Sequence, residues 1–196
     1  GEIYCFGDNS EGALGDGTTV SRNTPARIAS AGPFVRMSLS STVCAVTSTG
    51  TVQCWGDGTD GALGVPDLRF RSTPADVPGV TDAVDVSVWA GHGCAVIRDG
   101  TVRCWGRNDS GQLGDGTTVN SLRPVAVAGV TDATAVVTGY FTTCVLQSGG
   151  GVSCWGYNNT GIVSAPASST PVTRPTTRTG LSDVRAISHS AALVCA

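Results

Sequence analysis

Apolar and polar residues alternate along short stretches of this chain, and turn-forming residues separate these stretches. The clearest alternation is Val-Asp-Val-Ser-Val at residues 84–88, which would place the three valines on one face of a β-strand. Gly, Pro, Asn and Asp lie between such stretches, as they do at the turns of β-proteins. Since no stretch keeps a 3.6-residue apolar period, the pattern predicts an all-β protein with almost no helix.

One hairpin stands out at residues 94–104. Two strand-like runs flank Asp99-Gly100, a dipeptide typical of tight β-hairpin turns. Cys94 and Cys104 are equally distant from Asp99, so they would face each other across the ladder. Directly opposed residues have Cα atoms roughly 4.5–5.5 Å apart, a distance that a disulfide can span. The pattern predicts a Cys94–Cys104 disulfide.

The same unit recurs about every 50 residues, at Cys44 with Cys54 and at Cys144 with Cys154. A fourth copy is divided between the two ends of the sequence, with Cys5 near one end and Cys195 near the other. The whole of 1–196 is expected to form one domain of four units, at approximately 5–53, 54–103, 104–153 and 154–196, the last completed by 1–4. Four short strands for each unit would suit a propeller blade.

The second Cys of each unit is followed by an aromatic residue and a glycine. Residues 104–114 read Cys-Trp-Gly-Arg-Asn-Asp-Ser-Gly-Gln-Leu-Gly, and the other copies vary this theme. The pattern resembles the RCC1-type repeat (regulator of chromosome condensation), in a disulfide-bonded, secreted, bacterial variety. The resemblance implies a β-propeller of four-stranded blades; members of that family most often have seven.

The division of the fourth unit leaves three arrangements open. Four blades could close as a small ring through a Cys5–Cys195 disulfide, or two chains could exchange ends. Alternatively, the chain could be part of a larger propeller whose further blades come from the same or another chain.

The aromatic residue after the second Cys is expected to be structural. Its identical place in every blade suits packing between neighbouring blades. The residues concerned are Phe6, Trp55, Trp105 and Trp155.

Composition and charge argue against some classes of function and favour one cellular location. The net charge is −3 and all twelve basic residues are Arg, scattered mostly singly, so the basic stripe expected of a nucleic-acid-binding protein is missing. No apolar run approaches the ~20 residues that span a bilayer. Eight evenly spaced cysteines without the close spacing of zinc ligands favour disulfides and an extracellular or cell-surface location, with the periplasm possible.

Candidate binding residues are those that differ between otherwise similar copies. Aromatic residues and His92 precede the first Cys in two of the units, and an irregular basic loop interrupts the first of these two, unit 54–103. Residues 163–180, rich in Ser, Thr, Ala and Pro, resemble a long mobile connection. The candidates are Trp89, His92, Tyr140, Phe141, Arg69, Phe70 and Arg71.

These features predict a non-enzymatic propeller module, without a cofactor or metal, that binds another protein or copies of itself. One alternative is a secreted enzyme inhibitor, by resemblance to inhibitory propellers of that family. The other is a sugar- or calcium-binding, lectin-like module. Its calcium candidates would be Asp8, Asp16, Asp57, Asp60, Asp109 and Asp115 in the Gly-rich loops.

Overall fold

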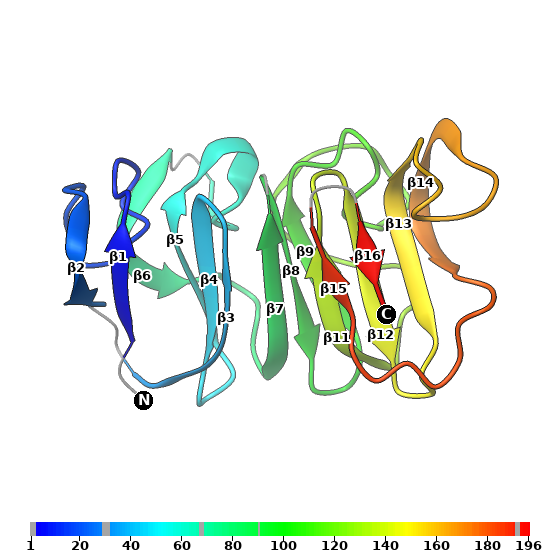
Figure 1. Ribbon diagram of the computed structural model, residues 1–196, viewed down its shortest axis with the longest axis horizontal. Coiled ribbons are helices and arrows are strands. Elements are labelled where there is room, and N and C mark those ends of the chain that lie inside the picture. The colour runs from blue at the N-terminus through cyan, green and yellow to red at the C-terminus, as the bar shows by residue number, and fades with distance from the viewer. Residues whose placement is uncertain (1–2, 29–31, 67–68, 90, 191–192) are drawn as a thin grey trace.

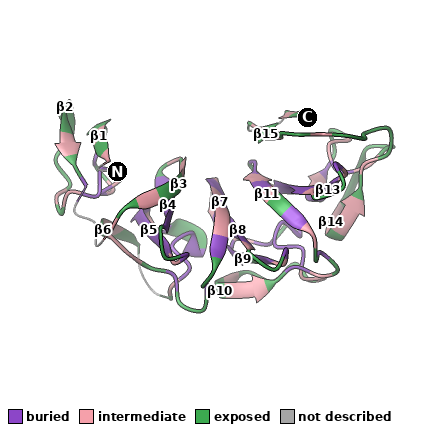
Figure 2. Cartoon of the chain, turned by 90° about the horizontal axis from the view of Figure 1, so that it is seen from below, coloured by how far each residue is buried: buried purple, intermediate pink, exposed green. Residues whose placement is uncertain are grey.

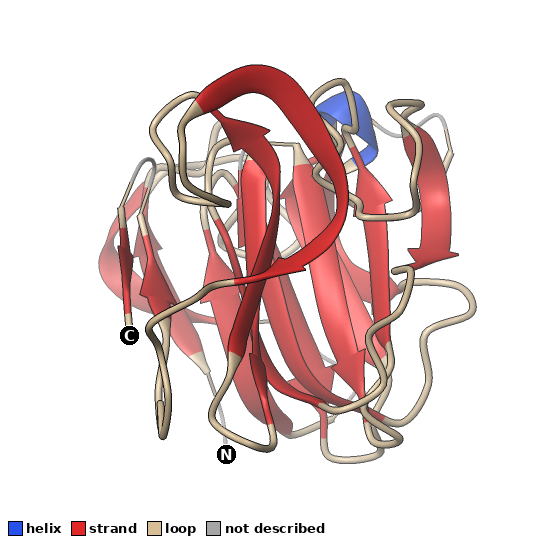
Figure 3. Cartoon of the chain, turned by 90° about the vertical axis from the view of Figure 1, so that its right-hand side faces the viewer, coloured by secondary structure: helices blue, strands red, loops and turns tan. Residues whose placement is uncertain are grey.

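A computed structural model of the chain describes residues 3–28, 32–66, 69–89, 91–190 and 193–196. It confirms the all-β prediction: in these ranges the one helical segment is a short 3-10 turn, η1 (Thr59–Gly61). Figure 3 shows strands throughout, with this turn as the single helical piece. The described part of the chain also contains no helix long and apolar enough for a membrane crossing.

Three four-stranded antiparallel sheets form the body of the molecule, and each takes its strands in chain order. The first contains β3 (Phe34–Leu39), β4 (Thr42–Thr47), β5 (Val52–Asp57) and β6 (Phe70–Asp76). The second contains β7 (Ala83–Trp89), β8 (His92–Ile97), β9 (Val102–Gly106) and β10 (Ser121–Ala126). The third contains β11 (Ala133–Thr138), β12 (Thr142–Gln147), β13 (Val152–Asn158) and β14 (Ser168–Thr177). These sheets are the predicted propeller blades.

A two-stranded sheet lies at each end of the chain. The N-terminal sheet pairs β1 (Tyr4–Gly7) with β2 (Arg22–Arg27), and the C-terminal sheet pairs β15 (Ser188–His189) with β16 (Val194–Cys195). By repeat position, β1 and β2 correspond to the third and fourth strands of a complete blade, and β15 and β16 to the first and second. The fourth blade is therefore divided between the two ends, with Gly1 and Glu2 outside the described residues.

The three predicted disulfides within blades are confirmed. Each joins the second strand of a sheet to the third, at residues directly opposed in the ladder. The Cα–Cα distances are 4.2, 4.1 and 4.1 Å for Cys44–Cys54, Cys94–Cys104 and Cys144–Cys154. All six sulfur atoms belong to fully buried residues, so the bridges lie in the core rather than at the surface.

The core lies between blades, and a tryptophan is central to three of its four clusters. Trp55, Trp105 and Trp155 are fully buried. Each indole Nε1 donates a hydrogen bond to a carbonyl oxygen of the preceding unit's loop, at Ala13, Ala62 and Gln112 respectively, with distances of 2.9, 2.8 and 2.8 Å. These bonds satisfy the polar atom of a large buried side chain and fix the orientation of neighbouring blades.

Phe6 departs from the structural role predicted for it. It holds the tryptophan position of the divided unit, but its side chain is 65% exposed. The reason is that the described chain places no blade before β1, so Phe6 has no preceding loop to pack against.

A buried asparagine organises the loops that receive Trp55 and Trp155, and the corresponding loop after β13, whereas the loop that receives Trp105 has Gly58 at this position. In the second complete blade, Asn108 Nδ2 donates to the Thr117 and Val119 carbonyls at 3.2 and 3.1 Å, while its Oδ1 accepts from Leu113 N at 2.9 Å. Asn9 and Asn158 act alike in their own loops. One amide therefore closes a loop of more than ten residues without regular structure.

The blades follow one another around an open arc, and the two ends of the chain lie apart (Figures 1 and 2). Cys5 is half-buried, Cys195 is exposed, and neither forms a disulfide. The four-blade ring closed by an intrachain Cys5–Cys195 bond is therefore wrong for this structure. The physical reason is the small rotation from blade to blade, which leaves four units well short of a full circle.

Candidate functional site

At one end of every complete blade, the residue before the second strand meets the residue after the Trp-Gly pair. In the third blade the Tyr157 amide donates to the Phe141 carbonyl at 2.9 Å, and the Arg107 amide donates to Gly91 in the second blade in the same way. The intervening Gly156 has a φ of +104°, and a Cβ there would collide with the Phe141 carbonyl oxygen. The side chains of 107, 141 and 157 thus emerge at the same end of their sheets.

Three aromatic rings gather at this end of the third blade. Phe141 lies edge-to-face with Tyr140, with ring centroids 4.5 Å apart, and with Tyr157, at 6.0 Å. Tyr140 is 49% exposed, and the other two are half-buried. Edge-to-face pairs of this kind hold rings in place, so the cluster is preorganised rather than loose.

Arg107, from the second blade, covers the Phe141 ring. Its Cζ atom lies 4.8 Å from the ring centroid, within the range of a cation–π contact. The same guanidinium donates from Nε to Asp109 Oδ2 at 2.8 Å and lies 3.8 Å from Asp60 Oδ2 of the first complete blade. The hydrogen bond from Arg107 lowers the pKa of Asp109, which therefore stays ionised. We call Arg107, Tyr140, Phe141 and Tyr157 the aromatic face.

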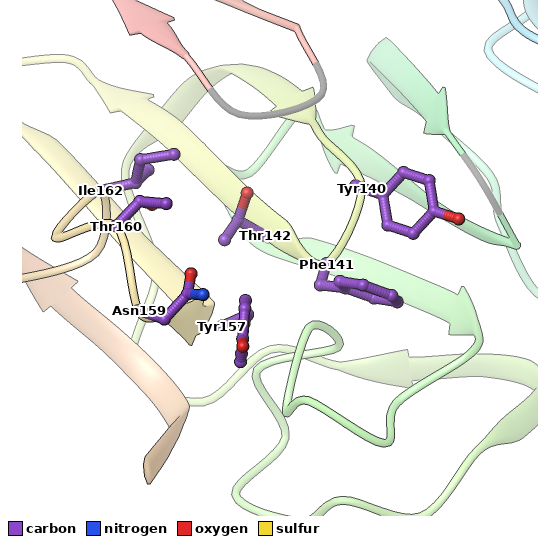
Figure 4. A pocket seen from close by; sticks show the side chains of 7 residues that line it. All are labelled: Tyr140, Phe141, Thr142, Tyr157, Asn159, Thr160 and Ile162. Carbon is purple, nitrogen blue, oxygen red and sulfur yellow. The ribbon is translucent and has the colours of Figure 1, made fainter. Parts of the chain in front are cut away.

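A hollow of about 160 Å³ opens beside this face. Tyr140, Phe141 and Thr142 form one wall, and the other comes from Tyr157 and the loop after β13 (Figure 4). Its exposed lining is mainly apolar.

A second hollow, of about 370 Å³, lies toward the first complete blade. Arg69 lines it together with Asp60, Leu122 and neighbouring loop residues. Since Asp60 also faces Arg107, the two hollows are connected by a continuous row of side chains, Asp60–Arg107–Phe141. The structure therefore places the Arg69 loop and the aromatic pair in the same region, although they are some 70 residues apart in sequence.

His92 does not belong to this surface, which corrects its inclusion among the candidate binding residues. It is fully buried, and Nε2 lies 3.0 Å from the Thr143 hydroxyl. That hydroxyl donates to the Gln112 carbonyl at 2.8 Å, so the histidine is the donor in its own bond with Thr143. Burial lowers the pKa of His92 to about 3, so the side chain is neutral and structural.

The other candidates are divided between the site and its surroundings. Trp89 ends β7 and is half-buried, opposite His92 in the ladder. Phe70 begins β6 and is 44% exposed, and Arg71 follows it half-buried. None of these three lines the aromatic hollow.

The Asp-rich loops use their carboxylates internally. Asp16 accepts hydrogen bonds from the amide and hydroxyl of Thr18 at 2.9 and 2.7 Å and from Arg22 Nε at 2.7 Å. These contacts hold the pKa of Asp16 at about 2. The part of the chain that the structure describes contains no cluster of three or more His, Cys, Asp or Glu side chains that could hold a metal ion.

Family models described as the regulator of chromosome condensation (RCC1) repeat match this sequence. One matches residues 1–46 and 99–146, and a second matches 40–62 and 84–112; together they cover more than half of the chain. The chain belongs to the RCC1 repeat family.

Solved structures agree with this assignment at the level of the fold. Human WBSCR16 is 22% identical with a TM-score of 0.78, over 97% of this chain and 54% of its own. Prp20p from Saccharomyces cerevisiae is 17% identical with a TM-score of 0.78, over 90% of this chain and 46% of its own. The RCC1 repeat chain thus spans about half the length of the solved structures that it matches. No curated protein sequence is similar enough to count as a relative.

Within the repeat pattern, sequence reasoning missed Arg107 and Tyr157. The signal was present, because the position after Trp-Gly reads Asp57, Arg107 and Tyr157 in successive copies. A residue that changes charge and type at a fixed place in an RCC1 repeat indicates a position that the fold itself does not constrain.

Proposed function

We propose that this chain is a non-enzymatic module for protein–protein interaction, and that the aromatic face is its contact surface. The observation that carries the proposal is the Arg107–Phe141 contact, in which side chains from two blades together present rings and a cation to solvent. Tyr, Trp and Arg are the residues that most often contribute strongly to binding at protein interfaces.

The size of the hollow favours a protein partner over a small ligand. Small-molecule sites usually enclose about 300–1,000 Å³, whereas the hollow beside Phe141 has about 160 Å³. Such a volume fits one inserted apolar side chain, flanked by contacts on the surrounding rings. The partner would therefore bring an exposed apolar side chain to this surface.

The charges around the aromatic face indicate which charge the partner should carry at the edge of the contact. Asp60 and Asp109 both approach Arg107, so two carboxylates surround one guanidinium. A basic group on the partner would be attracted to this edge, whereas a nucleic-acid backbone would be repelled by it.

The proposed location is extracellular or cell-surface. Three buried disulfides persist most readily in an oxidising compartment. Outside the cell, the disulfides would keep the blades rigid and would thus hold the rings of the aromatic face in place.

The solved relatives support a protein partner by analogy only. The yeast structures describe Prp20p in terms of its binding to Gsp1p and histones, and RCC1 (Prp20) bound to Kap60. The shared blade architecture can therefore present protein-binding surfaces, and here the aromatic face would provide one.

Site-specific photo-crosslinking tests the proposal. A photoreactive phenylalanine at position 140 should crosslink to a discrete protein from the extracellular medium or cell surface, and Phe141→Ala in the same chain should abolish the product. The matched control carries the photoreactive residue at Val119, which is 71% exposed and outside the face. Equal crosslinking from both positions, or crosslinking that survives Phe141→Ala, would contradict the proposal.

A further inference from the structure

We infer that the second hollow, which Gly58 and Asp60 line, is a subsite for a carboxamide side chain, an Asn or Gln of the protein partner. This subsite rests on the proposed function, because the side chain would come from the same protein that contacts the aromatic face. The loop around the hollow differs from the three equivalent loops of the same chain. The difference leaves one buried N–H group without an acceptor among the described residues.

The loop after β5 lacks the asparagine that closes the other loops. Residues 57–61 read Asp-Gly-Thr-Asp-Gly, whereas Asn9, Asn108 and Asn158 stand at the place of Gly58 in the other copies. All three asparagines are at most 1% exposed. Each of their amides both donates and accepts hydrogen bonds inside its loop. Gly58 therefore removes both a donor and an acceptor from this loop.

The backbone replaces the donor half of the missing amide. Gly58 N donates to the Arg69 carbonyl at 2.7 Å. Val119 is the counterpart of Arg69 in the next copy, and its carbonyl accepts instead from Asn108 Nδ2 at 3.1 Å. A direct bond between backbone groups thus closes the loop at Gly58, where the other loops use a side chain.

No described residue replaces the acceptor half. Leu14 N, Leu113 N and Val163 N each donate to the Oδ1 atom of their own loop's asparagine, at 2.8, 2.9 and 3.0 Å. Leu63 holds the same position in the loop after β5 and is 1% exposed, but its amide donates no hydrogen bond to another described residue. Buried N–H groups without an acceptor are rare and costly. An acceptor oxygen from another molecule would therefore stabilise this loop.

The second hollow gives another molecule access to this part of the loop. It has a volume of about 370 Å³ and is lined by Gly58 itself, the residue from which the missing side chain would project. Gly58 has a φ of −106° and a ψ of 9°, a conformation that residues with a side chain also adopt. A carboxamide that enters from the hollow would thus take the place that the Asn108 amide fills in the next copy.

The charges that line the hollow favour a neutral group. Asp60 and Arg69 carry opposite charges, so a charged ligand would be attracted by one and repelled by the other. The Asp60 carboxylate accepts no hydrogen bond from another described residue, and Arg107 Nη1 lies 3.8 Å from its Oδ2 atom. A carboxamide is neutral, donates through its NH₂ group and accepts through its oxygen. It would donate to Asp60 and accept from the Leu63 amide.

The hollow is continuous with the aromatic face. Asp60 lies beside Arg107, and Arg107 covers the Phe141 ring. Val65 and Leu122 provide apolar wall for the methylene groups of an inserted side chain. A partner segment that is anchored at Phe141 would therefore reach the hollow with a neighbouring side chain.

The chemical test uses acetamide as the probe and the backbone amide signals of the ¹⁵N-labelled chain. Acetamide should shift the Leu63 amide proton downfield in a saturable manner, whereas the Leu113 proton, already bonded to Asn108, should not respond. Acetate has no N–H donor and is repelled by Asp60, so it should shift the Leu63 signal less at equal concentration. A Leu63 proton that does not respond, or responds equally to acetate, would overturn the inference.

Gly58→Asn supplies the amide from the chain itself. The Leu63 signal of this variant should lie downfield without acetamide and stay in place when acetamide is added, and the urea midpoint should rise. Gly58→Ala is the matched control: it adds a Cβ without an amide, so it should keep the response to acetamide. An unshifted Leu63 signal or a lower urea midpoint in Gly58→Asn would show that the loop has no room for an amide and would refute the subsite.

The affinity of the crosslinked partner separates this subsite from the aromatic face. Gly58→Asn should weaken binding about tenfold, while crosslinking from position 140 persists, and Gly58→Ala should stay within about twofold of the wild type. Equal affinities of wild type and Gly58→Asn would count against the subsite and leave the aromatic face intact. A chain whose Leu63 amide responds to acetamide but which crosslinks to no protein would support the subsite's chemistry and contradict the proposed function.

Discussion

The guanidinium of Arg107 lies 4.8 Å from the ring centroid of Phe141, and the two residues come from different blades. The contact therefore spans a blade boundary at the surface, above the boundary that Trp155 spans in the core. The buried and the exposed contacts at this boundary have different roles. Trp155 fixes the relative position of the blades, and the Arg107–Phe141 pair makes use of that fixed position to present a defined surface.

We predict that removing the aromatic face has little effect on stability. Phe141→Ala should lower the free energy of unfolding by about 1–2 kcal/mol, because its ring is only half-buried. Arg107→Ala should lower it by about 1 kcal/mol or less, because cation–π and ion-pair contacts at the surface contribute little. Urea denaturation measures the change. A loss comparable to that of a core substitution would show that the face is part of the fold rather than a site.

Breaking one blade disulfide should cost far more. The double variant Cys94→Ser/Cys104→Ser should lose about 2–3 kcal/mol, since a bridge across a short hairpin restricts the unfolded chain by about that amount. The double variant Cys5→Ser/Cys195→Ser is the matched control. Cys5 and Cys195 form no disulfide in this structure, so this variant should unfold at the wild-type urea concentration with the three blade disulfides intact. Equal losses in the two variants would contradict the prediction.

Two of the three blade-interface tryptophans, Trp105 and Trp155, should differ in their response to loss of the indole N–H. Trp105→Phe leaves the Ala62 carbonyl without its donor at 2.8 Å, and among the described residues no second donor reaches it. After Trp155→Phe, the Gln112 carbonyl still accepts from Thr143. We predict a loss of about 2–4 kcal/mol for Trp105→Phe and about 1 kcal/mol less for Trp155→Phe, measured by urea denaturation. The reverse order would contradict this account.

The buried His92 should make the fold sensitive to mild acid. Burial lowers the pKa of His92 to about 3, below the ordinary value of 6.5 that it regains on unfolding. The unfolded chain therefore binds the proton more readily, so stability is complete above pH 6.5 and falls as the pH drops toward 3. By pH 5 the loss is about 2 kcal/mol.

Comparison with His92→Gln isolates this effect. The variant is less stable at neutral pH, but its stability should change less between pH 6.5 and pH 4. His189 retains a smaller slope of the same sign, because burial lowers its pKa too, and Asp16 titrates below this window with a pKa of about 2. Parallel pH profiles for the two proteins would show that His92 does not have the lowered pKa.

The repeat made much of the fold predictable from sequence, because local patterns dictate most of a blade. Asp99-Gly100 sets the hairpin register, and that register alone places Cys94 against Cys104. Residues 163–180 show the limit of such patterns: composition suggested a mobile connection, but β14 occupies Ser168–Thr177. Pairing with β13 orders this segment, although the register shifts twice along the ladder, and pairing partners are not visible in local composition.

The site was predicted only in part, because it depends on the curvature of the arc. Tyr140 and Phe141 were recognisable as aromatic residues that vary between copies, whereas the contact of Phe141 with Arg107 requires the distance between two blades. The arrangement of the blades in space also decides whether four units form a closed ring. The sequence positions of Cys5 and Cys195 fit such a ring, but the rotation between blades leaves the arc open (Figure 2).

The most direct measurement of the central claim is the affinity of the crosslinked partner for wild-type and Phe141→Ala chains, by titration calorimetry. A residue at the centre of the contact should contribute 2 kcal/mol or more, so we expect binding to weaken at least about thirtyfold, with Val119→Ser within about twofold of the wild type. An unchanged affinity for Phe141→Ala, in a chain that retains its three disulfides, would show that the aromatic face is not where this propeller binds its partner.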